Sequence, residues 1–165
     1  RTLEAMKKGI IKSLGQTGQE GEQKEGMDMS LVSLDVTLEN SRVIHKLTYA
    51  GANNSLYLIR KGQLIELNAD KMPIGIYYGQ DKPFTNKEII LESGDTFYLY
   101  TDGYADQFGG EQGKKLTKKR FKDILINMQS KNMNAQKKAL EKTLSDWAGE
   151  QQQVDDVLII GIRIV

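Results

Sequence analysis

The sequence has 165 residues, and its 23 lysines and arginines against 22 aspartates and glutamates give a net charge of +1. It contains no cysteine and a single histidine, which excludes disulfides, thiolate zinc sites, iron–sulfur clusters, cysteine nucleophiles and metal centres built from several histidines. The near-neutral charge argues against a dedicated nucleic-acid-binding domain. No apolar run approaches the roughly 18 residues of a membrane span. We therefore expect a soluble globular segment in which any metal chemistry uses carboxylates.

The first half of the chain predicts one helix followed by strands. Apolar residues recur at three- and four-residue steps over residues 2–14, which predicts an amphipathic helix. Glycines among polar residues over residues 15–26 predict a polar loop. The pair Lys61-Gly62 predicts a hairpin, and Glu92-Ser93-Gly94 predicts a second one. The six predicted strands are Met29–Thr37, Val43–Ala50, Ser55–Arg60, Gln63–Leu67, Lys87–Leu91 and Asp95–Thr101.

The second half predicts two helices and a last strand. One apolar stripe runs from Phe121 to Met128, and another from Leu140 to Trp147 ends at Gly149. The nearly continuous apolar run at the C-terminal end, residues 157–165, predicts a central strand covered on both faces. Because the earlier strands follow one another without helices between them, the predicted fold class is α+β, with antiparallel sheets flanked by helices.

Carboxylates at two strand ends are candidates for metal binding. Asp102 follows an apolar strand and precedes Gly103, although an Asp-Gly pair is also typical of a plain turn. Asp155 and Asp156 precede the last apolar strand, where two charges are also typical of a solubilising pair. Adjacent strand residues point to opposite faces, so one of these two should face a given site. If the two strands are neighbours, Asp102 and one of the pair could bind a hard cation such as Mg²⁺ or Mn²⁺.

Other motifs in the sequence do not meet the requirements of their sites. The segment from Gly109 to Lys115 is one residue short of a Walker loop and lacks its Ser or Thr. A calcium loop starting at Asp102 has Gly113 where a bidentate Glu is needed. His45 lies within a predicted strand, which is typical of a structural or surface histidine rather than a catalytic base.

A basic cluster precedes and enters the first C-terminal helix. Two interpretations are open: a solvated helix face, or a surface that attracts an anionic phosphoprotein toward the acidic site. In the second interpretation Lys114, Lys115 and Lys118 are the candidate residues for substrate approach. The whole cluster is Lys114, Lys115, Lys118, Lys119, Arg120 and Lys122.

Six short motifs, taken in their order and spacing over residues 1–165, resemble the PPM-type metal-dependent Ser/Thr protein phosphatases. The likeness is greatest to the bacterial branch named for the sporulation stage II protein E and the stress-response sigma regulators. The motifs are Gly26-Met27-Asp28, Tyr49-Ala50-Gly51-Ala52-Asn53-Asn54, Pro73-Ile74-Gly75, Ser93-Gly94-Asp95, Tyr100-Thr101-Asp102-Gly103 and Asp155-Asp156-Val157.

The resemblance implies a β-sandwich flanked by helices and a centre of two Mn²⁺ or Mg²⁺ ions, at which a metal-bridging water attacks the phosphorus. It implies that Asp102 and Asp155 bind metal, with Gly103 and Asp156 as neighbours of the metal site. Residues 104–116 match a variable segment beside the active site, which makes the basic cluster a candidate surface for substrate approach.

The sequence also departs from the family pattern. An Asp that bridges both metals, followed by a Gly-His-Gly type turn, is absent, and the only histidine is His45. Ala52 stands where His is common, and Leu158 where Thr is common. We expect about a third of the domain to be missing and the chain to be a fragment, in keeping with a first residue other than Met. The fragment alone should have little or no activity, and missing strands would leave sheet edges that favour homodimers.

The resemblance further implies a cytoplasmic enzyme whose substrate is a phosphoprotein such as an anti-sigma-factor antagonist. It implies an upstream sensor or regulatory domain and leaves open whether the whole protein is tethered to a membrane. Two alternatives belong to other classes. One is a non-catalytic, degenerate phosphatase fold that binds or senses a partner; the other is a carbohydrate-binding sandwich with a structural Ca²⁺.

Overall fold

A computed structural model describes the chain over residues 2–19, 25–77 and 82–165. Residues 20–24 of the predicted polar loop lie outside the described residues. No helix within the described ranges is long and apolar enough to cross a bilayer. The chain forms two compact units. Unit 1 consists of Arg1–Leu56 and Leu67–Leu91, and unit 2 of Tyr57–Glu66 and Glu92–Val165.

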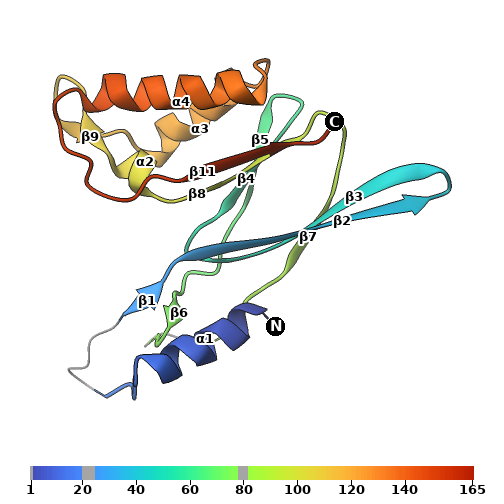
Figure 1. Cartoon of the computed structure of the whole chain (residues 1–165), viewed down its shortest axis with the longest axis vertical. Helices are drawn as coiled ribbons and strands as arrows, with labels where there is room; N and C mark the ends of the chain where they lie inside the picture. The colour runs from blue at the N-terminus through green and yellow to red at the C-terminus, as the bar shows by residue number, and fades with distance from the viewer. Residues whose placement is uncertain (1, 20–24, 78–81) are drawn as a thin grey trace. The chain divides into compact units, whose positions relative to one another are not determined.

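Unit 1 contains a three-stranded antiparallel sheet (Figure 1). Its order is β2 (Met29–Glu39), β3 (Arg42–Ala52) and β7 (Lys87–Leu91). The β2–β3 hairpin turns at Asn40 and Ser41, whose φ angles are 48° and 61°. Positive φ at both central residues is what a two-residue hairpin turn requires. The first two predicted strands are therefore confirmed, and His45 lies within β3.

A helix and a short strand pair complete unit 1. Helix α1 (Thr2–Ser13) confirms the predicted amphipathic helix, and its buried Leu3 packs with Ala52. Strands β1 (Gly26–Met27) and β6 (Ile74–Gly75) pair antiparallel. This pairing brings together two of the short sequence motifs that were quoted above.

Unit 2 contains a four-stranded sheet. Its order is β11 (Ile159–Arg163), β8 (Thr96–Tyr100), β4 (Leu56–Arg60) and β5 (Gln63–Leu67). Lys61 and Gly62 join β4 to β5 with φ angles of 51° and 77°, so the predicted hairpin at this pair is confirmed.

Helices cover one face of the unit 2 sheet (Figure 1). The helices of unit 2 are α2 (Gly103–Asp106), α3 (Lys118–Asn127) and α4 (Met133–Ala148). A short hairpin of β9 (Phe108–Gly109) and β10 (Lys114–Lys115) lies between α2 and α3 in the sequence. The Asn132 side chain caps α4 by accepting a 2.8 Å hydrogen bond from the Ala135 amide. Helix α4 ends at Gly149, as predicted, where φ is 55°. Helices α3 and α4 confirm the two predicted C-terminal helices.

Aromatic rings connect the sheet of unit 2 to its helices. Tyr57 on β4 stacks on Tyr100 on β8 with ring centroids 4.5 Å apart. Phe121 on α3 lies 5.3 Å from Tyr100 and 4.8 Å from Tyr104 on α2. All four side chains are buried. Because these rings hold the end of β8 and the beginning of α2, they fix the position of the residue between them, Asp102.

The predicted hairpin at Glu92-Ser93-Gly94 is wrong. Strand β7 pairs with β3, whereas β8 pairs with β4 and β11, so the chain passes here from one sheet to another. The Asp95 side chain accepts a hydrogen bond from the Glu92 amide at 2.8 Å, and the Asp95 carbonyl accepts one from the Ile164 amide at 2.9 Å. These contacts attach the turn to unit 2 instead of closing a hairpin.

The prediction of a central last strand is also wrong. Strand β11 pairs only with β8 in the described part of the chain, and it begins at Ile159 rather than Val157. Its burial alternates along the strand, with Ile160 43% and Ile162 38% exposed. The physical reason is that α4 covers one face of β11 only, so apolar side chains on the other face stay exposed.

Candidate metal centre

Asp102 lies between the end of β8 and the first residue of α2. Its backbone is already helical, with φ −73° and ψ −17°, and its carbonyl accepts a 2.9 Å hydrogen bond from the Asp106 amide. Its side chain makes no capping hydrogen bond to the helix. The half-buried carboxylate therefore keeps its oxygens available for another ligand.

Asp155 and Asp156 lie in the loop before β11 and are exposed. The Asp155 carboxylate accepts a 2.7 Å hydrogen bond from the Asp156 amide, which is a local turn contact. Neither residue forms an ion pair among the residues that the structure describes. Two carboxylates without a cationic partner suit the binding of a cation from solution.

Thr101 links the two acidic segments. Its hydroxyl donates a hydrogen bond to the Asp156 carbonyl at 2.7 Å and accepts one from the Leu158 amide at 2.9 Å. The Thr101 amide donates to the Leu158 carbonyl at 3.0 Å. These bonds continue the β8–β11 ladder, in which Tyr100 faces Ile159. The condition set by the sequence, that the two strands be neighbours, is therefore met.

Gly103 allows the two segments to approach closely. A Cβ atom at this position would lie 2.4 Å from the Asp156 carbonyl oxygen and 3.1 Å from that of Asp155. A side chain would therefore force the segments apart. The sequence identified Gly103 as a neighbour of the site, whereas the role of Thr101 was missed. The sequence feature that points to Thr101 is a hydroxyl residue directly after an apolar strand and directly before Asp102.

The donor set of this centre is small. No group of three or more His, Asp or Glu side chains in the described ranges is arranged to hold a metal ion. The residues present still suit Mg²⁺ or Mn²⁺, because Asp102, Asp155 and Asp156 offer only oxygen atoms and none is paired with a described cationic side chain. Such ions retain several water ligands, so two protein carboxylates fit as part of a metal site but do not complete its ligand set.

The predicted basic cluster is divided between several contacts. Lys115 on β10 forms a 2.8 Å ion pair with Asp106. Lys122 pairs with Glu66 at 2.7 Å. Burial is the largest single influence on the pKa of Lys122 and lowers it, but the hydrogen bond to Glu66 and the interactions with Glu66 and Tyr57 together raise this pKa above its ordinary value. Arg120 lies over the Trp147 ring at 4.4 Å. Lys114, Lys118 and Lys119 remain exposed to solvent.

The motifs of unit 1 form structural contacts. The Asn53 side chain donates a 2.8 Å hydrogen bond to the Asp28 carboxylate, and Tyr49 donates its hydroxyl to the Asn54 carbonyl at 2.6 Å. A Cβ atom on Gly51 would lie 2.0 Å from the Tyr49 hydroxyl, so only glycine fits there. These residues hold the end of β3 in place.

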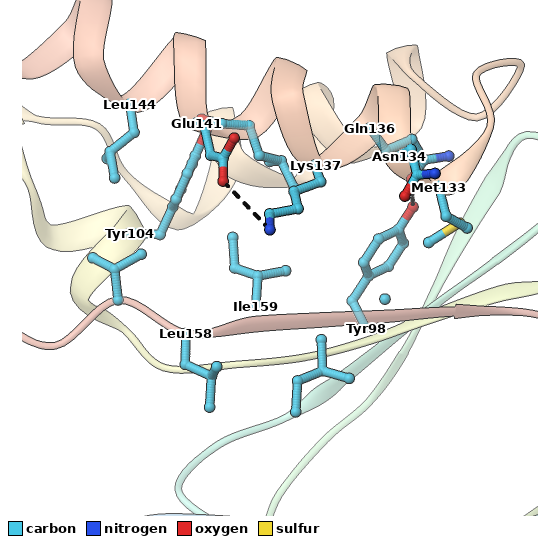
Figure 2. A pocket seen from close by; sticks show the side chains of 14 residues that line it. Tyr98, Tyr104, Met133, Asn134, Gln136, Lys137, Glu141, Leu144, Leu158 and Ile159 are labelled. Carbon is cyan, nitrogen blue, oxygen red and sulfur yellow. Dashed lines mark hydrogen bonds and ion pairs between the residues drawn. The ribbon is translucent and has the colours of Figure 1, made fainter.

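One cavity of unit 2 is separate from the acidic residues. Figure 2 shows this cavity of about 550 Å³ between α4 and β11, lined by apolar side chains such as Leu144 and Ile159. Lys137 and Glu141 of α4 form an ion pair beside it. At one end, Tyr98 donates a 2.6 Å hydrogen bond to Gln136. Asp102, Asp155 and Asp156 are not among the residues that line it.

Comparisons with known proteins agree on one family and one fold. The family model described as Stage II sporulation protein E (SpoIIE) matches residues 9–165. The SiaA-PP2C domain of Pseudomonas aeruginosa is 27% identical, with a TM-score of 0.72 over 99% of this chain and 68% of that chain. No curated protein matches the chain.

Two more distant structures bear on the fold alone. PppA of Pseudomonas aeruginosa, a key regulatory component of T6SS, is 15% identical with a TM-score of 0.59, over 98% of this chain and 67% of that chain. The PP2C phosphatase domain of SpoIIE from Bacillus subtilis, with a fragment of its regulatory domain, is 17% identical with a TM-score of 0.58, over 99% of this chain and 47% of that chain. The α+β fold class with antiparallel sheets and helices is confirmed, and the chain is a partial domain by comparison with these structures.

Proposed function

Because the chain belongs to the SpoIIE family of PP2C-like phosphatase domains, we propose that it carries part of the active site of a metal-dependent protein phosphatase acting on phosphoserine or phosphothreonine. The observation that supports this most is the juxtaposition of Asp102 with Asp155 and Asp156 through the hydroxyl of Thr101. Carboxylates at two neighbouring strand ends provide a rigid location for hard cations.

In this proposal Asp102 and Asp155 hold Mn²⁺ or Mg²⁺. When bound, such ions lower the pKa of a water ligand and offset the negative charge of a phosphoryl group. The chain itself supplies the positions of the carboxylates. Thr101 fixes the backbone at Asp156, and Gly103 permits the short distance between the two segments.

The chain spans about two thirds of the SiaA and PppA structures, and a site of two carboxylates is incomplete. We therefore expect the isolated chain to bind Mn²⁺ weakly and to have little or no hydrolytic activity. In the whole protein the substrate would be a phosphoprotein, and a small anti-sigma-factor antagonist is the class that we propose. An upstream sensor or regulatory domain would control the activity.

Mn²⁺ titration followed by electron paramagnetic resonance tests the metal site in this chain. We expect Mn²⁺ to bind with a Kd on the order of 1 mM. This binding should be lost in Asp102→Asn and in Asp155→Asn. Asp123→Asn is the matched control, because Asp123 is an exposed aspartate on α3 in the same unit. Binding that is equally strong in Asp102→Asn and the unmodified chain would contradict the proposal.

Hydrolysis of p-nitrophenyl phosphate with Mn²⁺ tests the expected inactivity. Turnover by the chain at the rate of a complete phosphatase domain, abolished by Asp102→Ala, would show that the chain is a complete enzyme and that the expectation of inactivity is wrong.

A second candidate function is a non-catalytic module that keeps the phosphatase fold to bind a partner. The small donor set favours it, since no group of three ligating side chains occurs in the described ranges. The two candidates differ in their metal dependence. A module of this kind should bind its partner equally well with Mn²⁺ and with a chelator, whereas the phosphatase requires the ion.

A further inference from the structure

Three lysines near the beginning of α3 face solvent without an acidic partner in the described part of the chain. Lys114, Lys118 and Lys119 are exposed, and none forms an ion pair with a described residue. They differ in this from Lys115 and Lys122, which pair with Asp106 and Glu66. We call Lys114, Lys118, Lys119 and the exposed Phe108 ring the lysine patch.

The stability of α3 does not explain these lysines. Negative side chains are favoured in the first turn of a helix and positive ones are disfavoured, because of the helix dipole. The first turn of α3 contains no acidic residue and begins with Lys118 and Lys119. A locally unfavourable choice of this kind is typical of residues that serve another purpose.

The lysine patch is held rigidly by contacts of its hairpin with α4. The Gly110 amide donates to the Trp147 carbonyl at 2.8 Å, and the Trp147 indole donates to the Gln107 carbonyl at 3.0 Å. A Cβ atom on Gly109 would lie 1.8 Å from the Trp147 carbonyl oxygen, so the hairpin packs directly on the helix backbone. Phe108 is 39% exposed, beside the Lys115 ammonium 5.9 Å from its ring centroid.

The same segment is attached to the helix that follows Asp102. The Leu116 amide donates to the Gln107 carbonyl at 3.0 Å, and the Thr117 amide donates to the Ala105 carbonyl at 2.7 Å. Helix α2 has four residues and is therefore about 6 Å long. Through its bond to Ala105, Thr117, which directly precedes Lys118, is attached to the helix that begins directly after Asp102, within the same unit.

We propose that the lysine patch binds an acidic segment of the protein substrate, at a distance from the phosphorylated residue itself. This inference rests on the proposed function. Asp102, Asp155 and Asp156 alone would repel an anionic substrate, whereas uncompensated lysines nearby attract it over roughly a Debye length of 8 Å. The exposed Phe108 adds an apolar contact. The partner is an acidic stretch of polypeptide that flanks the phosphoserine and contains an apolar residue.

Binding of two synthetic peptides tests the proposal without turnover. One is a fluorescent phosphoserine peptide flanked by glutamates and one leucine, and the other is the same peptide with glutamines in place of the glutamates. We expect the acidic peptide to bind at least roughly tenfold more tightly to the unmodified chain at low salt. The difference should shrink as salt is added.

Paired charge reversals locate the binding surface. Lys114→Glu with Lys118→Glu should weaken binding of the acidic peptide by roughly tenfold and leave the glutamine peptide unaffected. The matched control is Lys131→Glu with Lys138→Glu, which makes the same charge change at exposed positions near and on α4. The control should change binding less than about twofold, and thermal unfolding verifies that both variants fold.

Three outcomes would overturn the proposal: equal binding of the two peptides, no binding of the acidic peptide, or equal effects of the two paired variants. Sedimentation with anionic phospholipid vesicles provides a further arm. Vesicle binding that depends on Lys114 and Lys118, together with no preference between the peptides, would assign the lysine patch to a membrane surface instead. Because the experiment measures peptide binding, a chain without hydrolytic activity still tests the lysine patch. A failed Mn²⁺ titration would contradict the proposed metal site but would not change the peptide-binding result.

Discussion

The hydroxyl of Thr101 donates a 2.7 Å hydrogen bond to the carbonyl of Asp156, 55 residues further along the chain. The same hydroxyl accepts from the Leu158 amide. One side chain at the end of β8 thereby satisfies both a donor and an acceptor in the loop that carries the second acidic segment. The relative position of Asp102 and Asp155 depends on this residue.

Thr101→Val should therefore destabilise unit 2 and weaken Mn²⁺ binding together. Valine has the shape of threonine but makes neither hydrogen bond. Both bonds are exposed to solvent, so each loss should cost about 0.5–1.5 kcal/mol. Urea unfolding measures the stability, and Mn²⁺ titration measures the affinity. Thr101→Ser keeps the hydroxyl and should restore most of both. A valine variant with unchanged Mn²⁺ affinity would contradict the positioning role of Thr101.

Gly103→Ala should have a larger structural effect than its single methyl group suggests. The new Cβ atom would lie 2.4 Å from the Asp156 carbonyl oxygen, and this neighbour is backbone, so the whole loop must shift. We expect a loss of about 1–3 kcal/mol in the free energy of unfolding and a loss of Mn²⁺ binding. Gly9→Ala on α1 is the control, because nothing lies within 4 Å of its Cβ position. That control should be neutral or stabilise by about 0.5–1 kcal/mol.

The sequence predicted elements whose evidence is local. The helices that contain Leu3, Phe121 and Leu140 follow from apolar spacing, and the Lys61-Gly62 hairpin follows from residues that adopt positive φ. Asp102 could be singled out because it directly follows an apolar strand. Each of these features is contained within a short stretch of chain.

Features that depend on distant residues could not be predicted in this way. The apolar run at the C-terminal end predicts a central strand, but an apolar sequence does not reveal how many strands pair with it. Strand β11 pairs with β8 alone among the described residues. The contacts of Thr101 join residues more than 50 positions apart. The residues Glu92-Ser93-Gly94 predict a hairpin, although Asp95, which follows them, has its partner Arg60 on β4.

Arg60→Met should strongly destabilise unit 2. Asp95 is 2% exposed and accepts hydrogen bonds from Arg60 at 2.6, 3.0 and 3.1 Å. The Asp95 carboxylate raises the pKa of Arg60 chiefly through the hydrogen bonds between them. Removing the guanidinium leaves a buried charge without its partner, which costs about 3–5 kcal/mol.

Urea unfolding at neutral pH measures this loss. Arg163→Met is a useful comparison, because Arg163 donates to Thr96 and to backbone carbonyls but has no acidic partner among the described residues. Arg163→Met should lower the free energy of unfolding less than Arg60→Met does. Equal losses in the two variants would show that the ion pair with Asp95 contributes no more to stability than the hydrogen bonds of Arg163.

Alkaline pH should destabilise unit 2 through its buried tyrosines. Burial raises the pKa of Tyr104 from 10.0 to about 12, and burial likewise raises the pKa of Tyr57 and of Tyr98. Below pH 10 the tyrosine is neutral in both states and its contribution is complete. Between about pH 10 and pH 12 the unfolded chain loses the phenolic proton first, so the free energy of unfolding falls as the pH rises. For Tyr104 alone this loss is about 1 kcal/mol at pH 11.

Tyr104→Phe removes this titration and should make the alkaline loss smaller by about 1 kcal/mol between pH 9 and pH 11. At neutral pH the same variant should be less stable by about 1 kcal/mol, because the phenol no longer donates to the Leu140 carbonyl. Urea unfolding at both pH values separates the two effects, and the ultraviolet absorbance of tyrosinate identifies the ionising group. An alkaline loss of the same size in the variant and the unmodified chain would show that Tyr104 ionises as readily in the folded chain as in the unfolded one.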